Sequence, residues 1–202
     1  LLEQYAAEVK FLRAFIYYYL TCFWGDVPFV TTTVSAGDEE LTAPRTERAV
    51  IVDFILKELR DAAEKLPPYI TPGTDKFGRI SGAAAKAMES RVALQNHRWE
   101  AARDASKELM PGGRFAYHQL YSTGRPEQDY FDLFTFEGRA SRNPNNLEPI
   151  LSYVFNFNLP APTRHNLSRE LQVPDQIIRF NPTQSLIDSY LCSDGLPIEK
   201  SP

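Results

Sequence analysis

Residues 3–28, EQYAAEVKFLRAFIYYYLTCFWGDVP, predict a long helix that ends abruptly. Apolar side chains recur along it every three or four residues, as on the buried faces of a helix. They form two stripes, the first of Leu2, Tyr5, Val9, Leu12, Ile16, Tyr19 and Phe23, the second of Phe11, Phe15, Tyr18 and Cys22. Because two stripes cover most of a helix surface, the pattern predicts a central helix that is buried on nearly all sides. Gly25 can adopt the left-handed conformation that terminates a helix, and Pro28 cannot continue one.

Length and composition are those of one globular unit. A chain of 202 residues can bury about 70% of its unfolded surface in a single core. The formal net charge is -4 and no cluster of Lys and Arg occurs, which argues against a nucleic-acid partner. The two cysteines, Cys22 and Cys192, do not indicate a disulfide framework, and two thiols are expected although a pairing stays open. The chain begins inside a helical pattern, so we expect a fragment of a longer protein.

Three more helices are predicted before residue 113. Thr46 is expected to cap the first of them and Ser81 the second. The apolar positions of the first are Ile51, Ile55, Leu59, Ala62 and Leu66, and one face of the third carries Trp99, Ala102, Ser106 and Leu109. The short turn at 95–98 predicts an antiparallel helix hairpin of tetratricopeptide type. No clean 34-residue period relates the helix pairs, so a regular repeat array is disfavoured.

Helical periodicity fails across residues 115–173, where Gly, Pro, Asn and Arg separate short aromatic runs. Alternating apolar side chains at 151–157 predict a strand, and Pro149 restricts that position to a strand start or an edge. A short helix is predicted over 183–190, with Asn181 as its N-cap.

The aromatic side chains of this irregular region are the candidate ligand site. The helices need their own aromatics for packing, whereas loops on a rigid support often carry binding residues. The candidate ligand-binding residues are Tyr121, Phe157, Asn158, Arg164, His165 and Asn166. An alternative is that Phe157 only continues the inward face of the predicted strand.

Motifs for catalysis or for a metal are not recognised. No glycine-rich phosphate loop follows a strand, and no Gly-x-Ser-x-Gly motif occurs. The histidines His97, His118 and His165 are scattered, without the spacing of metal ligands. No cofactor, no metal and no enzymatic activity are therefore predicted.

Several segments resemble the SusD/RagB family of nutrient-binding outer-membrane lipoproteins. They are AEVKFLRAF at 7–15, WGDVPFV at 24–30, GRISGAAAKA at 78–87, WEAA at 99–102, and a stretch at 182–198 that contains PTQ and DGLPI. These segments follow one another in the family's order and span most of the chain.

The resemblance implies a mostly α, SusD-like fold with divergent tetratricopeptide-type helix pairs, an irregular loop-rich region and a short strand. The chain would be one SusD-like domain fragment, with helical hairpins at 1–113, a loop-rich insert at 114–180, and a short helix with an Asp-Gly segment at 181–202. It also implies a protein exposed at the cell surface on the outer membrane, held there by a lipid anchor that this sequence lacks.

By the same resemblance, the protein would bind an oligosaccharide or polysaccharide and deliver it to a SusC-like TonB-dependent outer-membrane transporter. Aromatic faces would stack on sugar rings, and polar side chains would bind the hydroxyls. Two alternatives stay open: a peptide-binding RagB-type member, and a tetratricopeptide-like scaffold for protein–protein interaction.

Overall fold

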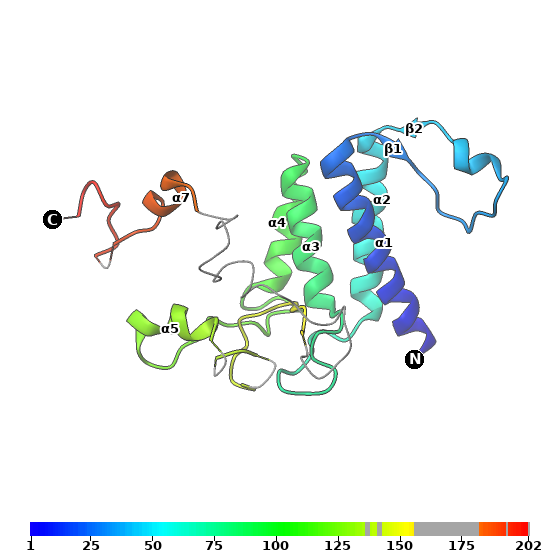
Figure 1. Ribbon diagram of the computed structural model, residues 1–202. Coiled ribbons are helices and arrows are strands. Elements are labelled where there is room, and N and C mark those ends of the chain that lie inside the picture. Colours follow the sequence, from blue (N-terminus) through cyan, green and yellow to red (C-terminus); the bar gives the residue numbers. More distant parts are fainter. Residues whose placement is uncertain (136–137, 141–142, 156–181, 193, 202) are drawn as a thin grey trace, which may run out of the picture.

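The structure is a computed structural model that describes residues 1–135, 138–140, 143–155, 182–192 and 194–201. Four helices stand side by side and form an array: α1 (Leu2–Trp24), α2 (Arg48–Lys65), α3 (Gly82–Gln95) and α4 (Trp99–Leu109) (Figure 1). Each packs mainly on its neighbours in chain order, so α1 and α4 form the two edges of the array. The prediction of a mostly α fold is confirmed.

α1 is buried along one stripe only, so the prediction of burial on nearly all sides was wrong. Phe11 and Tyr18, from the second predicted stripe, are 3% and 7% exposed, while Cys22 is exposed. All seven side chains of the first stripe face solvent, with exposed fractions from 44% for Tyr5 to 84% for Leu2. The reason is that α1 packs along its length on α2 and touches α3 only slightly.

Gly25 ends α1 as predicted, with a positive φ of 68°, and its N–H donates to the Thr21 carbonyl at 3.1 Å. Its ψ of -115° lies outside the left-handed helical region that the sequence suggested. This conformation is open essentially to glycine alone, so the residue type is required by the backbone.

The apolar stripe of α2 is the centre of the core. Ile51, Ile55 and Leu59 are fully buried between α1 and α3, as predicted. The predicted cap was wrong: Thr46 lies in β2 (Arg45–Thr46), which pairs antiparallel with β1 (Val27–Pro28). α2 begins after it, and the N–H of Arg48 donates to the Asp26 carboxylate, which takes the place of a side-chain cap.

Small residues at the start of α3 allow close packing, as the sequence indicates. Ser81 caps the helix as predicted, because its Oγ accepts the Ala84 N–H at 3.1 Å. A Cβ on Gly82 would lie 2.4 Å from the ring of Phe115 and 3.1 Å from the Ala63 carbonyl oxygen. Gly82 therefore lets the fully buried Phe115 ring dock against the ends of α2 and α3.

Ion pairs link each helix of the array to the next. Arg13 of α1 donates to Glu58 of α2, Arg60 of α2 to Glu89 of α3, and Lys86 of α3 to Glu108 of α4. Glu58, Glu89 and Lys86 are all buried. Burial alone would lower the pKa of Lys86, but hydrogen bonds to Glu89 and Glu108 outweigh it and raise that pKa. These charges are therefore retained in paired form inside the array.

The remaining elements are short. The connection from β1 to β2 contains a 3-10 helix, η1 (Glu39–Thr42), and the loop-rich region contains α5 (Pro126–Leu133), which the sequence analysis missed. Its start signals are Pro126 in the first turn and two acidic residues after it. α7 (Gln184–Asp188) lies within the predicted helix, but its N-cap is Thr183 and not Asn181, which lies outside the described residues.

The strand predicted from residue 151 is absent from its described part. Residues 151–155 run without strand structure over the end of the array, and Val154 and Ser152 lie against Gly78 there. Among the described residues, strand pairing consists of β1 with β2 and one isolated bridge, Leu191 to Pro197. Apolar alternation alone does not form a strand where no partner strand lies alongside.

Candidate functional site

A pocket of about 420 Å³ lies in the loop-rich region, and we call it the loop pocket. Its walls are Leu133, Phe134, Arg139, Ala140, Glu148, Pro149 and Ser152. The first two come from the end of α5 and the others from the two loop segments that follow it. Phe134 is 74% exposed, so most of its ring is open to solvent.

Asn146 holds the chain that forms one wall of the loop pocket. Its side chain is fully buried; its Nδ2 donates to the Gly138 carbonyl at 2.6 Å, and its Oδ1 accepts the Glu148 N–H at 3.2 Å. The two hydrogen bonds tie residue 138 to residue 148 across the loop. The backbone of Glu148 is thus held by one buried amide.

Tyr121 holds Glu148 from the other side. Its backbone N–H donates to the Glu148 Oε2 at 2.8 Å, and its hydroxyl lies 3.5 Å from the Asn143 amide nitrogen. The neighbouring His118 ring nitrogen lies 2.8 Å from the Leu147 carbonyl oxygen. Segments 118–121 and 147–148 are therefore joined side by side, behind the pocket wall.

The start of α5 is fixed by Asp129. Its carboxylate accepts hydrogen bonds from the Thr123 hydroxyl, the Thr123 backbone N–H and the Ser122 hydroxyl. The Thr123 hydroxyl, followed by the Thr123 N–H, lowers the pKa of Asp129 because both stabilise the charged carboxylate. These bonds orient the helix that Phe134 directly follows.

The loop pocket combines an exposed aromatic ring with polar and charged side chains. Phe134 offers an exposed aromatic face, Glu148 and Arg139 bring one negative and one positive charge to the wall, and the Ser152 hydroxyl can donate and accept hydrogen bonds. Its volume lies within the roughly 300–1,000 Å³ of small-molecule sites. The arrangement suits binding of a polar ligand that has apolar ring faces.

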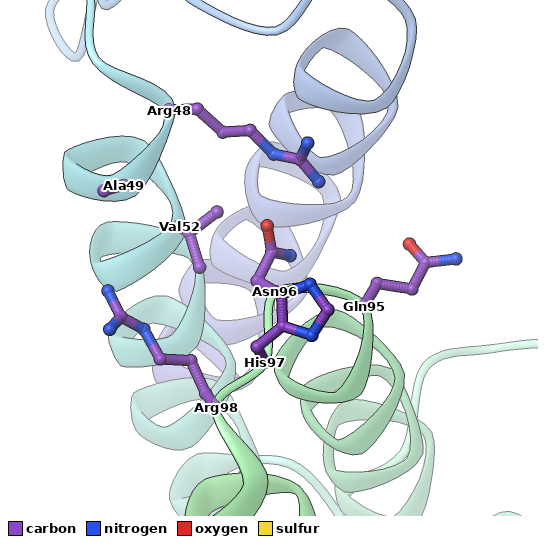
Figure 2. A pocket seen from close by; sticks show the side chains of 7 residues that line it. All are labelled: Arg48, Ala49, Val52, Gln95, Asn96, His97 and Arg98. Carbon is purple, nitrogen blue, oxygen red and sulfur yellow. The ribbon is translucent and has the colours of Figure 1, made fainter.

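A second pocket, of about 410 Å³, lies at the opposite end of the array, and we call it the helix-end pocket. Figure 2 shows Arg48 at the start of α2, with Asn96, His97 and Arg98 projecting from the turn between α3 and α4. Arg98 is paired with Asp53 at 3.2 Å, and Asp26 already accepts the backbone N–H of Arg48. The guanidinium groups would favour an anionic group, but nearby carboxylates partly compensate them.

Of the residues predicted to bind ligand, the structure describes Tyr121. It does not line the loop pocket, but it is bonded to Glu148, which does. The other five, Phe157, Asn158, Arg164, His165 and Asn166, lie outside the described residues. Their role stays a prediction.

The sequence analysis missed Phe134, Arg139 and Glu148 as pocket residues. Phe134 belongs to one of the short aromatic runs, at 130–134, but its exposure follows from helix α5, which the sequence did not predict. Glu148 directly precedes Pro149, which the sequence analysis places at the start or the edge of the predicted strand. A carboxylate beside a proline carries no binding signal of its own, so no local pattern could have identified it.

Over the residues that the structure describes, no group of three His, Cys, Asp or Glu side chains is placed to hold a metal ion. Within the same residues, no helix has the length and apolarity to cross a membrane. Cys22 and Cys192 are both free thiols.

This chain is similar in sequence and fold to several SusD-like proteins. The model of a SusD-like family, described as starch-binding and associating with the outer membrane, matches residues 2–94. A SusD-like protein of Formosa agariphila is 32% identical over 140 residues, which are 69% of this chain and 23% of that protein. A solved SusD-like protein of Bacteroides fragilis superimposes with a TM-score of 0.62 at 27% identity, over 74% of this chain and 26% of the other. A SusD-like carbohydrate-binding protein of the same organism superimposes with a TM-score of 0.60 at 25% identity, over 74% of this chain and 26% of the other.

The matches agree with the segments that carried the resemblance. The family model spans α1 to α3, which contain the motifs at 7–15, 24–30 and 78–87. The chain spans about a quarter of the length of the relatives it matches, 23% of the first and 26% of the solved structures. Carbohydrate binding and association with the outer membrane are properties of this family. In sequence over residues 2–94, and in fold, the chain is SusD-like.

Proposed function

We propose that the chain is part of a surface glycan-binding protein, and that the loop pocket is where an oligosaccharide is held. The observation that carries this proposal is the exposed ring of Phe134 beside Glu148 and Arg139. Aromatic faces stack on the apolar faces of sugar rings, while charged side chains and hydroxyl groups form hydrogen bonds with the sugar hydroxyls. Binding is capture without a chemical step.

The loops next to the pocket extend the proposed site. Tyr121 acts by positioning Glu148. Phe157, Asn158, Arg164, His165 and Asn166 follow the pocket segment in the chain and are proposed to contact further sugar units. The order of the chain supports this, because residue 152 lines the pocket five residues before Phe157.

We further propose delivery of the captured oligosaccharide to a SusC-like TonB-dependent transporter, from a lipid-anchored position on the cell surface. The family's description as associating with the outer membrane supports this placement. The proposals of a transporter partner and of a lipid anchor rest on the family resemblance alone.

The test is calorimetry on the full-length protein, with maltoheptaose as the first probe and a glycan array to extend it. Phe134→Ala should weaken binding about tenfold or more, as loss of an exposed aromatic contact at a binding site does. Phe131→Ala is the matched control, because Phe131 is an exposed ring of α5 that does not line the pocket. Equal affinity for both variants and the wild type, with any glycan that binds, would place the site elsewhere.

A further inference from the structure

The exposed stripe of α1, which we call the outer stripe, has a regular heptad spacing. Its residues follow one another at alternating intervals of three and four: Leu2, Tyr5, Val9, Leu12, Ile16, Tyr19 and Phe23. This is the a/d pattern by which one helix packs along another with a small crossing angle. A lone apolar residue on a surface needs no explanation, but seven in one straight seam do.

Within the described residues, no other helix packs on this seam, and its seven side chains stay 44–84% exposed. The buried side of α1, which carries Ala7, Phe11 and Ala14, faces α2. Tyr19 contacts side chains of α1 itself, with ring centroids 4.8 Å from Phe15 and 6.2 Å from Phe23. Tyr5, near the start of the helix, also lies under the guanidinium of Arg79, 5.3 Å from its ring centroid. α1 therefore has one packed side and one unpaired apolar side.

The outer face of α4, at the opposite edge of the array, is polar. The outer face of α4 carries Glu100, Arg103, Asp104 and Lys107, all exposed, and Arg103 is paired with Asp104 at 2.8 Å. A polar outer face is what closes a stack of helices against water. The polar outer face of α4 is typical of an edge helix, whereas the apolar outer stripe of α1 is typical of a helix with neighbours on both sides.

We propose that the outer stripe is covered by a further helix of the same polypeptide, contributed by a part of the protein outside residues 1–202. To follow the seam from Leu2 to Phe23 this helix needs about 20 residues, or roughly 30 Å. The relatives supply the length, because this chain spans 23% and 29% of two of them. A helix on the same chain has an effective concentration of about millimolar order, so it outcompetes a second copy for the face.

Flanking charges agree with an apolar partner helix. Arg13 and Glu8 lie beside the seam, and both are already paired within the chain, Arg13 with Glu58 and Glu8 with Arg79. They offer little free charge to a partner. The covering helix should therefore present mainly apolar side chains at its own a and d positions.

The test uses the full-length protein with Cys22 and Cys192 replaced by Ala and one reporter cysteine added. Val9→Cys places the thiol in the outer stripe, and Arg103→Cys places it on the outer face of α4. Under native conditions Val9→Cys should react with a maleimide at least about 100-fold more slowly than in the urea-unfolded protein, as expected for a site reached only by local opening. Arg103→Cys should react within about tenfold of its unfolded rate.

Two results would overturn the proposal. If native Val9→Cys reacts as fast as in urea, the face is open to solvent or to another molecule. If the protein is a dimer in light scattering and protection of Val9→Cys disappears on dilution, a second copy covers it. As a second measurement, Leu12→Glu should lower the melting temperature by several degrees or prevent folding, whereas Lys107→Glu should change it little. Equal melting temperatures would also refute the covering helix.

Discussion

The helical array and the loop region of residues 114–155 are stabilised by different interactions. The array buries continuous apolar stripes, and ion pairs such as Arg60 with Glu89 link its helices. In the described part of the loop region the buried residues are Phe115, Gly138, Ala140 and Asn146, and the fixed contacts are mostly hydrogen bonds. A buried apolar side chain contributes about 1.5–3 kcal/mol and a hydrogen bond about 1 kcal/mol.

This difference separates stability from recognition. Because the array does not depend on the loops for most of its core, the loops can keep aromatic rings such as Phe134 exposed. The loop region should therefore lose its shape before the array unfolds. Its main attachment to the array is Phe115, whose ring lies against Gly82.

The largest effect should come from breaking that attachment. Phe115→Ala removes a fully buried ring and should lower the free energy of unfolding by about 3–5 kcal/mol. Urea unfolding followed by circular dichroism measures it. Phe134→Ala is the comparison, because its ring is mostly exposed and should change stability by less than about 0.5 kcal/mol. Similar midpoints for the two variants would mean that Phe115 does not join the regions.

A smaller effect should stay within the loop region. Asn146→Ala leaves the Gly138 carbonyl and the Glu148 N–H without their partner and should cost about 1–3 kcal/mol locally. Hydrogen exchange should rise at residues 138–148, while the amides of α2 and α3 keep their protection. Ligand binding by the loop pocket should also weaken in Asn146→Ala, because the Glu148 N–H loses its hydrogen bond to the Asn146 side chain.

The outcome that contradicts this picture is equal loss of protection in both regions. Asn145→Ala provides the control, because Asn145 is exposed and only its backbone N–H is bonded, to the Asn143 side chain. It should leave hydrogen exchange and binding near those of the wild type.

The array was predictable because its signals are periodic. The stripe of α2 and the Ser81 cap of α3 are local patterns, and both were confirmed. The burial of α1 was not predictable from its own residues, because periodicity shows which faces are apolar but not whether a neighbour is present. The Thr46 cap failed for a related reason: the acceptor that replaces it, Asp26, lies 22 residues before Arg48.

The region that contains the candidate site was predictable from the sequence, but the residues that line the pocket were not. Irregular, aromatic-rich sequence pointed to the loops, and the loop pocket lies there. One of its charged groups, Glu148, is positioned by hydrogen bonds with Asn146 and Tyr121 that leave no local pattern in the sequence. The strand predicted at 151–157 failed over its described part, 151–155, because pairing depends on a partner strand, which the alternation of side chains cannot supply.

The smallest expected effect concerns a strained position within the array. Among the described residues other than glycine, His97 alone has a positive φ, 58°. It closes α3 in a Schellman arrangement, in which the N–H of Arg98 donates to Ala93 and that of His97 to Leu94. Glycine is the residue that this position usually holds.

His97→Gly should therefore stabilise the protein. Relief of the left-handed backbone contributes about 1–2 kcal/mol, and the greater unfolded-state freedom of glycine removes about 0.5–1 kcal/mol of that. The net gain should be about 0.5–1 kcal/mol, visible as a higher urea midpoint. Asn96→Gly, one residue earlier, should instead destabilise, because φ there is -108° and the Asn96 side chain donates to the Val92 carbonyl. If His97→Gly also destabilises, the edge contact of His97 with Trp99, 5.1 Å between ring centroids, outweighs the strain, and this turn is held by its side chains as the loop region is.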